Sequence, residues 1–307
     1  MAIARAEEAP RSPTAPSAWV ISLTEENDKF APTNKDRYYT QGLKVAFNRG
    51  DRSFFSLTQE INTPSDTISP NPSPFDQPYS SALYFGWGYG RILDRGGRRD
   101  VLFSVEAKAG IIGPAAGGEF IQGKFHQLIG TPAAAGWGTQ TPNEAAFNVD
   151  GELRRRFDLD GATKDDLDLI ARSVVQFGTL RTQVLFGAQA RWGRHLGHSW
   201  GHSYIRHSNG YDPIDCLVSP TASAGHAFWG FVDTQVEVVV RNYATDGGNF
   251  RESPGVPRRA VVLQCGLGAT FQVSNWSATY FLAIRTKEFE TQEDMHIFGG
   301  LKGQFLF

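Results

Sequence analysis

The amino-acid sequence predicts an all-β fold, a transmembrane antiparallel β-barrel of about twelve strands with a short helix in one extracellular loop. Two observations lead to this prediction. Apolar and polar residues alternate with a period of two through the C-terminal fifty residues, and similar segments can be placed along the rest of the chain. Because successive side chains of a strand point to opposite faces, this alternation indicates half-buried antiparallel strands and not helices.

Residues 1–16 are rich in Ala, Pro and charge, have no apolar period and are predicted to be a disordered leader. A cleaved secretion signal has an apolar core of about 7 to 15 residues, which this stretch lacks. The protein is therefore expected to be either cytoplasmic or a mature form whose signal is replaced by Met1. Residues 17–307 are predicted to form a single barrel domain.

A soluble sandwich would show the same alternation, so the residues on each face decide between the two architectures. An apolar outer face, aromatic strand ends and a polar inner face with pairable charges are typical of an outer-membrane barrel, as is an even number of strands. The predicted strands cover residues 17–26, 38–49, 52–62, 80–93, 100–112, 143–157, 166–178, 181–194, 226–242, 260–272, 276–289 and 294–306.

Charges of both signs recur on the predicted inner face, so a narrow lumen closed by ion pairs is expected. These charges are Lys44, Glu60, Glu106, Lys108, Asp150, Glu152, Arg154, Arg191, Asp233, Glu237 and Lys302. An interfacial aromatic girdle is predicted from Trp19, Trp87, Tyr89, Trp192 and Trp276.

The connections follow once the C-terminus is placed in the periplasm. The predicted periplasmic turns are 50–51, 94–99 and 274–275, and the predicted outside loops are 27–38, 63–79, 113–142 and 243–259. A long stretch, 195–225, is left on the periplasmic side with no assigned role.

Composition excludes several classes of protein. A mean hydropathy of -0.33 and charges throughout leave no run of about 18 apolar residues, the length of a spanning helix. A net charge of -2 argues against a nucleic-acid partner. The two cysteines, Cys216 and Cys265, are too few for a disulfide framework or a cysteine-based zinc site.

The outside loop 113–142 carries the most informative chemistry. Glu119 to Ile129 is predicted to form about three helical turns, which place Gln122 and His126 on one face at i and i+4. A lone histidine beside aromatic residues is more often structural than catalytic. Its interpretation changes if other polar groups gather at the same rim.

Such groups stand at the predicted outer ends of strands: Asn27 and Asp28, Thr40, and Asn143 with Glu144. Carboxylate and amide oxygens of this kind suit calcium. A histidine beside the cation could deprotonate water while the cation stabilises an ester oxyanion. The alternative is that each rim carboxylate only solvates its loop.

Four stretches carry a family resemblance: LTEENDKFAPTNKDRYYTQGL (23–43), DQPYSSALY (76–84), GPAAGGEFIQGKFHQLIGTPAAAGWGTQTPNE (113–144) and RTKEFE (285–290). Together they resemble the outer-membrane lipid A 3'-O-deacylases, the LpxR family, over nearly the whole chain after residue 17. The resemblance implies a twelve-stranded barrel that removes the 3'-linked acyloxyacyl group of lipopolysaccharide with calcium.

The resemblance also implies site residues. His126 matches the water-activating histidine and Gln122 the glutamine one turn before it, while Asn27, Asp28 and Thr40 match the polar rim and Glu144 the Asn-Glu motif. Asp28 and Glu144 are the predicted calcium ligands. Substrate binding is predicted for Lys35, Asp76 and Tyr79.

The sequence departs from the family pattern at two places. Gln77 stands where a basic residue is usual, and Ser80-Ser81 stand where Ala-Gly is usual. Loss of a cation at position 77 is expected to weaken the hold on a lipid A phosphate or to change which lipid is accepted.

Two competing motifs lie in the stretch 195–225. Gly197 to Gly201 fits the G-x-S-x-G nucleophile elbow, but no helical period follows it and the chain has no βαβ pattern. Its histidines, His195, His198, His202 and His207, lack a helix or cysteines that would support a metal site, so a polar loop is predicted.

The resulting prediction is a bacterial outer-membrane ester hydrolase, monomeric, acting on lipopolysaccharide. The alternatives are a non-catalytic structural or pore-forming barrel, in which the helix only braces the mouth, and a phospholipase-type hydrolase acting on glycerophospholipids.

Overall fold

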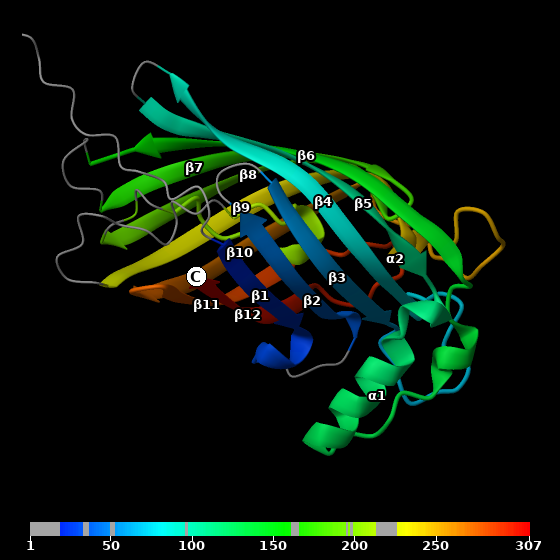
Figure 1. Ribbon diagram of the computed structural model, residues 1–307. Helices are drawn as coiled ribbons and strands as arrows, with labels where there is room; N and C mark the ends of the chain where they lie inside the picture. Colours follow the sequence, from blue (N-terminus) through cyan, green and yellow to red (C-terminus); the bar gives the residue numbers. More distant parts are fainter. Residues whose placement is uncertain are drawn as a thin grey trace, which may run out of the picture.

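The chain forms a closed barrel of twelve antiparallel strands in a computed structural model that describes residues 19–32, 37–49, 53–95, 98–160, 166–194, 196, 199–212 and 226–307. Each strand pairs with its neighbours in sequence, and the last pairs with the first. Figure 1 shows the tilted strands, with helix α1 projecting beyond one end. The predicted leader 1–16 and the turn 50–51 lie outside the described residues.

The strands are β1 (Trp19–Asn27), β2 (Tyr38–Arg49), β3 (Ser53–Thr63), β4 (Ser80–Arg95), β5 (Arg98–Ile112), β6 (Glu144–Asp158), β7 (Leu167–Gly178), β8 (Arg181–Arg194), β9 (His226–Asn242), β10 (Val261–Val273), β11 (Trp276–Arg285) and β12 (His296–Leu306). The helices are η1 (Asp28–Phe30), η2 (Pro114–Ala116), α1 (Gly118–Ile129), η3 (Gly136–Thr139), η5 (Ile205–His207) and α2 (Tyr243–Asp246). In the part of the chain that is described, no helix has the length and apolar character needed to cross a membrane.

The predicted alternation is confirmed in the wall. Along β10, Leu263, Leu267 and Phe271 are exposed on the outside, whereas Gln264 and Thr270 are buried inside. The apolar side chains therefore face lipid, and the polar ones face the lumen.

One strand is shorter than predicted. The segment 276–289 was expected to be strand throughout, but β11 ends at Arg285. Beyond it, Glu288 and Phe289 turn inward and are buried, and Phe289 pairs with Arg258 in an isolated bridge. Their inward direction ends the strand, because a continuing strand would alternate them across the wall.

Ion pairs form inside the lumen, as expected from the charges on the predicted inner face. Arg181 binds both carboxylate oxygens of Glu60. Arg285 Nη1 lies 2.7 Å from Glu237 Oε1. These side chains are nearly inaccessible to solvent, so each charge depends on its partner.

The described part of the stretch 195–225, which had no assigned role, lies inside the barrel. Residues 199–212, here called the lumen segment, run from the periplasmic end to the extracellular end and back. Trp200 O accepts from Arg154 Nη1 at 2.8 Å, and Asp212 pairs with Lys302 at 2.8 Å. The predicted polar loop is buried where it is described, because His202 and His207 lie inside the barrel, whereas His195 and His198 lie outside the described residues.

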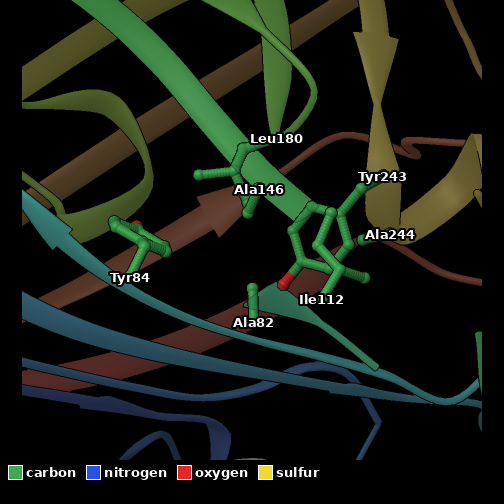
Figure 2. Close-up of a cluster of buried hydrophobic side chains, with 7 residues drawn as sticks. All are labelled: Ala82, Tyr84, Ile112, Ala146, Leu180, Tyr243 and Ala244. Carbon is green, nitrogen blue, oxygen red and sulfur yellow. The ribbon is translucent and has the colours of Figure 1, made fainter. Parts of the chain in front are cut away.

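An apolar cluster lies at the extracellular end of the lumen, where α2 meets the wall (Figure 2). Tyr243 in α2 is fully buried, and its hydroxyl accepts from Asn62 Nδ2 at 3.0 Å. The cluster joins α2 to β4, β5 and β6, and its members are Ala82, Tyr84, Ile112, Ala146, Leu180, Tyr243 and Ala244. The lumen is therefore filled by apolar packing here and by charge pairs elsewhere.

A filled lumen predicts poor ion conduction. In planar bilayers the protein should pass little current, since the lumen segment and the charge pairs occupy the described part of the lumen. A variant with a short Gly-Ser linker in place of residues 199–212 should conduct more. Retention of the heat-modifiable mobility of a folded barrel would serve as the folding control, and porin-sized steps from the unaltered protein would contradict the closed lumen.

Candidate active site

Helix α1 carries the predicted histidine and stands against β3 and β4 at the extracellular rim (Figure 1). Its observed bounds confirm the predicted helix within one residue. A Cβ at Gly118 would come within 2.5 Å of Ser81 Cβ, so glycine lets the helix begin close to the wall. Gln122 and His126 form the buried face, whereas Phe120 and Leu128 are exposed.

His126 is held in a defined orientation. Its Nδ1 lies 2.7 Å from the carbonyl oxygen of Pro132, just beyond the helix. A carbonyl only accepts, so Nδ1 is the donor, and Nε2 of the neutral ring carries the lone pair. This tautomer makes Nε2 a base.

Gln122 is fixed by an indole. Trp137 Nε1 donates to Gln122 Oε1 at 2.9 Å. Because an indole N–H only donates, the amide oxygen faces Trp137 and the amide NH2 group points elsewhere. Trp137 packs on Tyr79 with ring centroids 4.9 Å apart, and the Tyr79 hydroxyl donates to Thr67 O at 3.1 Å.

The Asn27-Asp28 pair ends β1 and begins η1. Asn27 caps this short helix by accepting from Lys29 N at 2.9 Å. Asp28 Oδ2 accepts from Arg37 N at 2.6 Å, which ties the two ends of the first outside loop together. Both Asn27 and Asp28 are buried.

Thr40 sits at an irregularity of β2. The β2–β3 register shifts between Tyr39 and Gln41, so Thr40 is the extra residue of a β-bulge. Bulges redirect side chains and occur beside active sites. Thr40 Oγ1 lies 2.7 Å from Thr63 Oγ1, and Tyr38, two residues earlier, has a positive φ of 63°, which is strained for an aromatic residue.

A cavity of about 410 Å³ lies beside both parts of the site, lined by their neighbours and not by His126 or Asp28 themselves. Lys29 and Arg37 line it on one side. Lys29 follows Asp28 in the chain, and the backbone N–H of Arg37 donates to Asp28 Oδ2. Thr131 and Pro132, the turn that orients His126, line it on the other. Its remaining lining residues are Ser65, Asp66, Thr67, Ile68 and Glu293.

Glu144 does not join this cavity. Its carboxylate accepts three backbone N–H groups, from Asn249 at 2.6 Å, Phe250 at 3.0 Å and Arg251 at 2.8 Å. Four strands, β2 to β5, separate its strand β6 from β1, which ends at Asn27. Glu144 therefore anchors the outside loop after α2, on a strand that is not a neighbour of the one that ends at Asn27.

Calcium fits the remaining residues only in part. Within the described ranges no three His, Cys, Asp or Glu side chains are grouped to hold a metal. Asp28, buried next to the cavity residue Arg37, retains the hard oxygen chemistry that calcium prefers.

The residues predicted to bind substrate are placed differently. Asp76 holds its own loop by accepting from Ser65 N at 2.7 Å and Ser65 Oγ at 2.6 Å. Tyr79 is fully buried under Trp137 and supports the helix. Lys35 lies outside the described residues. Gln77, the departure from the family pattern, is buried, with Nε2 3.4 Å from Tyr38 O.

The serine of the competing motif lies inside the barrel. Ser199 is buried, its carbonyl accepts from Arg191 Nη2 at 3.1 Å, and its hydroxyl accepts from Gly201 N at 3.2 Å. Among the described residues around it, 199–204, no helix follows, so the strand-turn-helix geometry of a nucleophile elbow is not present there.

Sequence reasoning missed the cations of the cavity and the support of the helix. Lys29 and Arg37 flank the predicted rim residues and could have been found from their positions in the first outside loop. The contact between Trp137 and Gln122 joins residues fifteen positions apart, and no periodic pattern in the sequence predicts it.

Comparisons with known proteins agree with this architecture. No curated protein sequence matches the chain. LpxR from Salmonella typhimurium has a similar structure, with a TM-score of 0.77, 21% sequence identity and coverage of 95% of this chain and 100% of that one. The β domain of the Bordetella autotransporter BrkA follows with a TM-score of 0.47, 9% identity and coverage of 94% and 98%. The family described as "Outer membrane protein LpxR" matches residues 1–307. The chain therefore belongs to the LpxR family, the outer-membrane lipid A deacylases whose motifs it carries.

Proposed function

We propose that the protein hydrolyses the 3'-linked acyloxyacyl ester of lipid A at its extracellular rim, with His126 as the general base. The observation that supports this most is the hydrogen bond from His126 Nδ1 to Pro132 O beside the cavity. It fixes the tautomer in which Nε2 is the basic nitrogen.

In the proposed reaction, Nε2 of His126 takes a proton from water as the oxygen attacks the ester carbonyl. The tetrahedral intermediate then collapses, the bond between the carbonyl carbon and the sugar oxygen breaks, and the imidazolium returns its proton to the leaving alkoxide. The products are the acyloxyacyl fatty acid, with its second ester intact, and a sugar hydroxyl. One histidine thus acts as base and then as acid.

Gln122 is suited to stabilise the oxyanion. Its amide oxygen accepts from Trp137 Nε1, which fixes the orientation of the amide and makes the NH2 group, the donor of this side chain, face away from the indole. It lies on the same buried helix face as His126, one turn earlier. Asn27 and Thr40 are proposed to position the ester from the opposite rim.

Calcium remains part of the proposal, with Asp28 as its anchor and without Glu144. When bound, the ion would add positive charge near the ester carbonyl. Backbone and amide oxygens of the first outside loop are chemically suited to complete such a site.

Lys29 and Arg37 are proposed to bind a lipid A phosphate. They supply positive charge in the cavity, whereas Gln77, at the position that is usually basic, is buried and neutral. Arg37 also pairs with Asp294 at 3.1 Å, which fixes its guanidinium at the rim.

His126→Ala should lower kcat by about 10²- to 10⁴-fold, the usual contribution of a general base. The assay is release of fatty acid from lipopolysaccharide, weighed by mass spectrometry. Gln127→Ala is the matched control, because Gln127 is the next residue of α1 and is exposed. Comparable release by the His126 variant would remove the base, and faster cleavage of glycerophospholipid by the unaltered protein would favour a phospholipase.

Chelation by EGTA should abolish activity and added calcium should restore it. Asp28→Asn should raise the calcium concentration needed by at least about tenfold, as weakening a metal site does. Glu144→Gln, with its carboxylate engaged by three backbone N–H groups, should leave that concentration unchanged. Full activity in chelator would exclude calcium, and a shift in the Glu144 variant alone would reverse the assignment.

Lys29→Gln should raise KM about tenfold for substrate bearing the nearby phosphate, as loss of a charged hydrogen bond would, and should have little effect on dephosphorylated substrate. Gln77→Lys is the companion variant, which should lower KM if a lysine there extends into the cavity. Equal KM values for both substrates in the Lys29 variant would rule out the phosphate contact.

A further inference from the structure

The lumen segment reaches the underside of the candidate site. Its tip is η5 (Ile205–His207), which lies at the extracellular end although the segment enters from the periplasmic end. Ile205 N donates to Glu26 Oε1 at 2.8 Å. Glu26 directly precedes Asn27 and Asp28 in β1, and it is fully buried.

The same carboxylate holds the second rim strand. Tyr39 Oη donates to Glu26 Oε2 at 2.7 Å, and Tyr39 directly precedes Thr40 at the bulge. A Cβ at Gly42 would lie 1.9 Å from the Tyr39 hydroxyl oxygen and 3.2 Å from Ile205 Cδ1. Glycine at this position gives Tyr39 and the tip the room to meet.

Arg206 closes the arrangement from the other side. Its guanidinium donates to both oxygens of Glu288, at 3.0 and 2.9 Å, and lies 4.8 Å from the centroid of the Tyr39 ring. Glu288 is in the outside loop after β11. Burial raises the pKa of Glu288, but Arg206 and Arg285 lower it by more, so it is ionised at neutral pH.

We propose that the lumen segment is a strut that positions the catalytic rim from inside the barrel, with Glu26, Tyr39 and Arg206 as positioning residues. Glu26 links the chain carrying Asn27 and Asp28 to the chain carrying Thr40, and the strut fixes Glu26. A segment from the periplasmic side thereby orients groups that act on the outer leaflet. The proposal rests on the proposed deacylase function for its kinetic consequence only.

The strut has a second, distant anchor that supplies a control. Near the periplasmic end, Asp212 pairs with Lys302 at 2.8 Å, and Asp212 N donates to Asn48 Oδ1 at 2.9 Å. Neither contact touches the rim. If the segment only stabilised the barrel, variants at its two ends would have the same effect on kcat. If it positions the rim, only the variants at the extracellular end should lower kcat.

The experiment compares Arg206→Ala and Tyr39→Phe with Asp212→Asn in the full-length protein. The first two should lower kcat for lipid A deacylation about tenfold or more per folded molecule, with KM nearly unchanged, because hydrogen bonds to charged groups fix the rim. Asp212→Asn should keep its kcat. Arg206→Lys should recover part of the loss, since it keeps the cation beside Tyr39 and Glu288.

Amide hydrogen exchange gives a readout that does not depend on catalysis. In the rim variants, exchange at residues 26–30 and 38–41 should rise about tenfold, while these amides stay protected in Asp212→Asn. If these rates and kcat are unchanged in Arg206→Ala and Tyr39→Phe, the strut is overturned and the deacylase stands. If exchange rises as expected but the unaltered protein releases no fatty acid, the proposed function fails and the strut stands.

Discussion

Every ionised group inside a closed strand ring needs a partner, because a buried charge without one costs several kcal/mol or more. This constraint organises the interior of the barrel. Strands of the wall supply two such pairs inside the barrel, Glu60 with Arg181 and Glu237 with Arg285. The lumen segment supplies another pair, in which Arg206 at its tip binds Glu288 of the loop after β11. The described part of the interior is therefore a paired polar core that can support the rim.

Two sets of contacts hold the side chains of the rim. Backbone and indole groups orient the reactive side chains directly, as Pro132 does for His126 and Trp137 does for Gln122. Beneath them, Glu26 receives hydrogen bonds from one neighbouring strand and from the lumen segment. Placement of this kind suits ester hydrolysis, since misplacing a catalytic group by about 1 Å can cost about 10²-fold in rate.

The fold could be predicted because strands and helices leave a local, periodic pattern of apolar and polar residues in the sequence. Alternation marks each strand of the wall, and the inner charges mark the lumen. The helix and its shared face for Gln122 and His126 followed from spacing of four residues. The lumen segment could not be predicted in this way, because its partners are single side chains on distant strands, such as Asp233 for Tyr204.

The surroundings of Glu144 could not be predicted for a related reason. The sequence places it at the outer end of a strand, as it places Asp28, but position at a rim does not specify position around the ring. A carboxylate that accepts three backbone N–H groups also has no sequence signature. Distances around a closed barrel depend on strand order, which the motifs alone do not encode.

The central claim is that water, activated by His126, attacks the ester carbonyl at this rim. Its most direct test is a single-turnover deacylation in ¹⁸O-labelled water, followed by mass spectrometry of both products. The account predicts the label in the carboxylate of the released fatty acid, none in the sugar hydroxyl, and no comparable release by His126→Ala. Label in the sugar hydroxyl, or labelled acid from the variant at an undiminished rate, would contradict it.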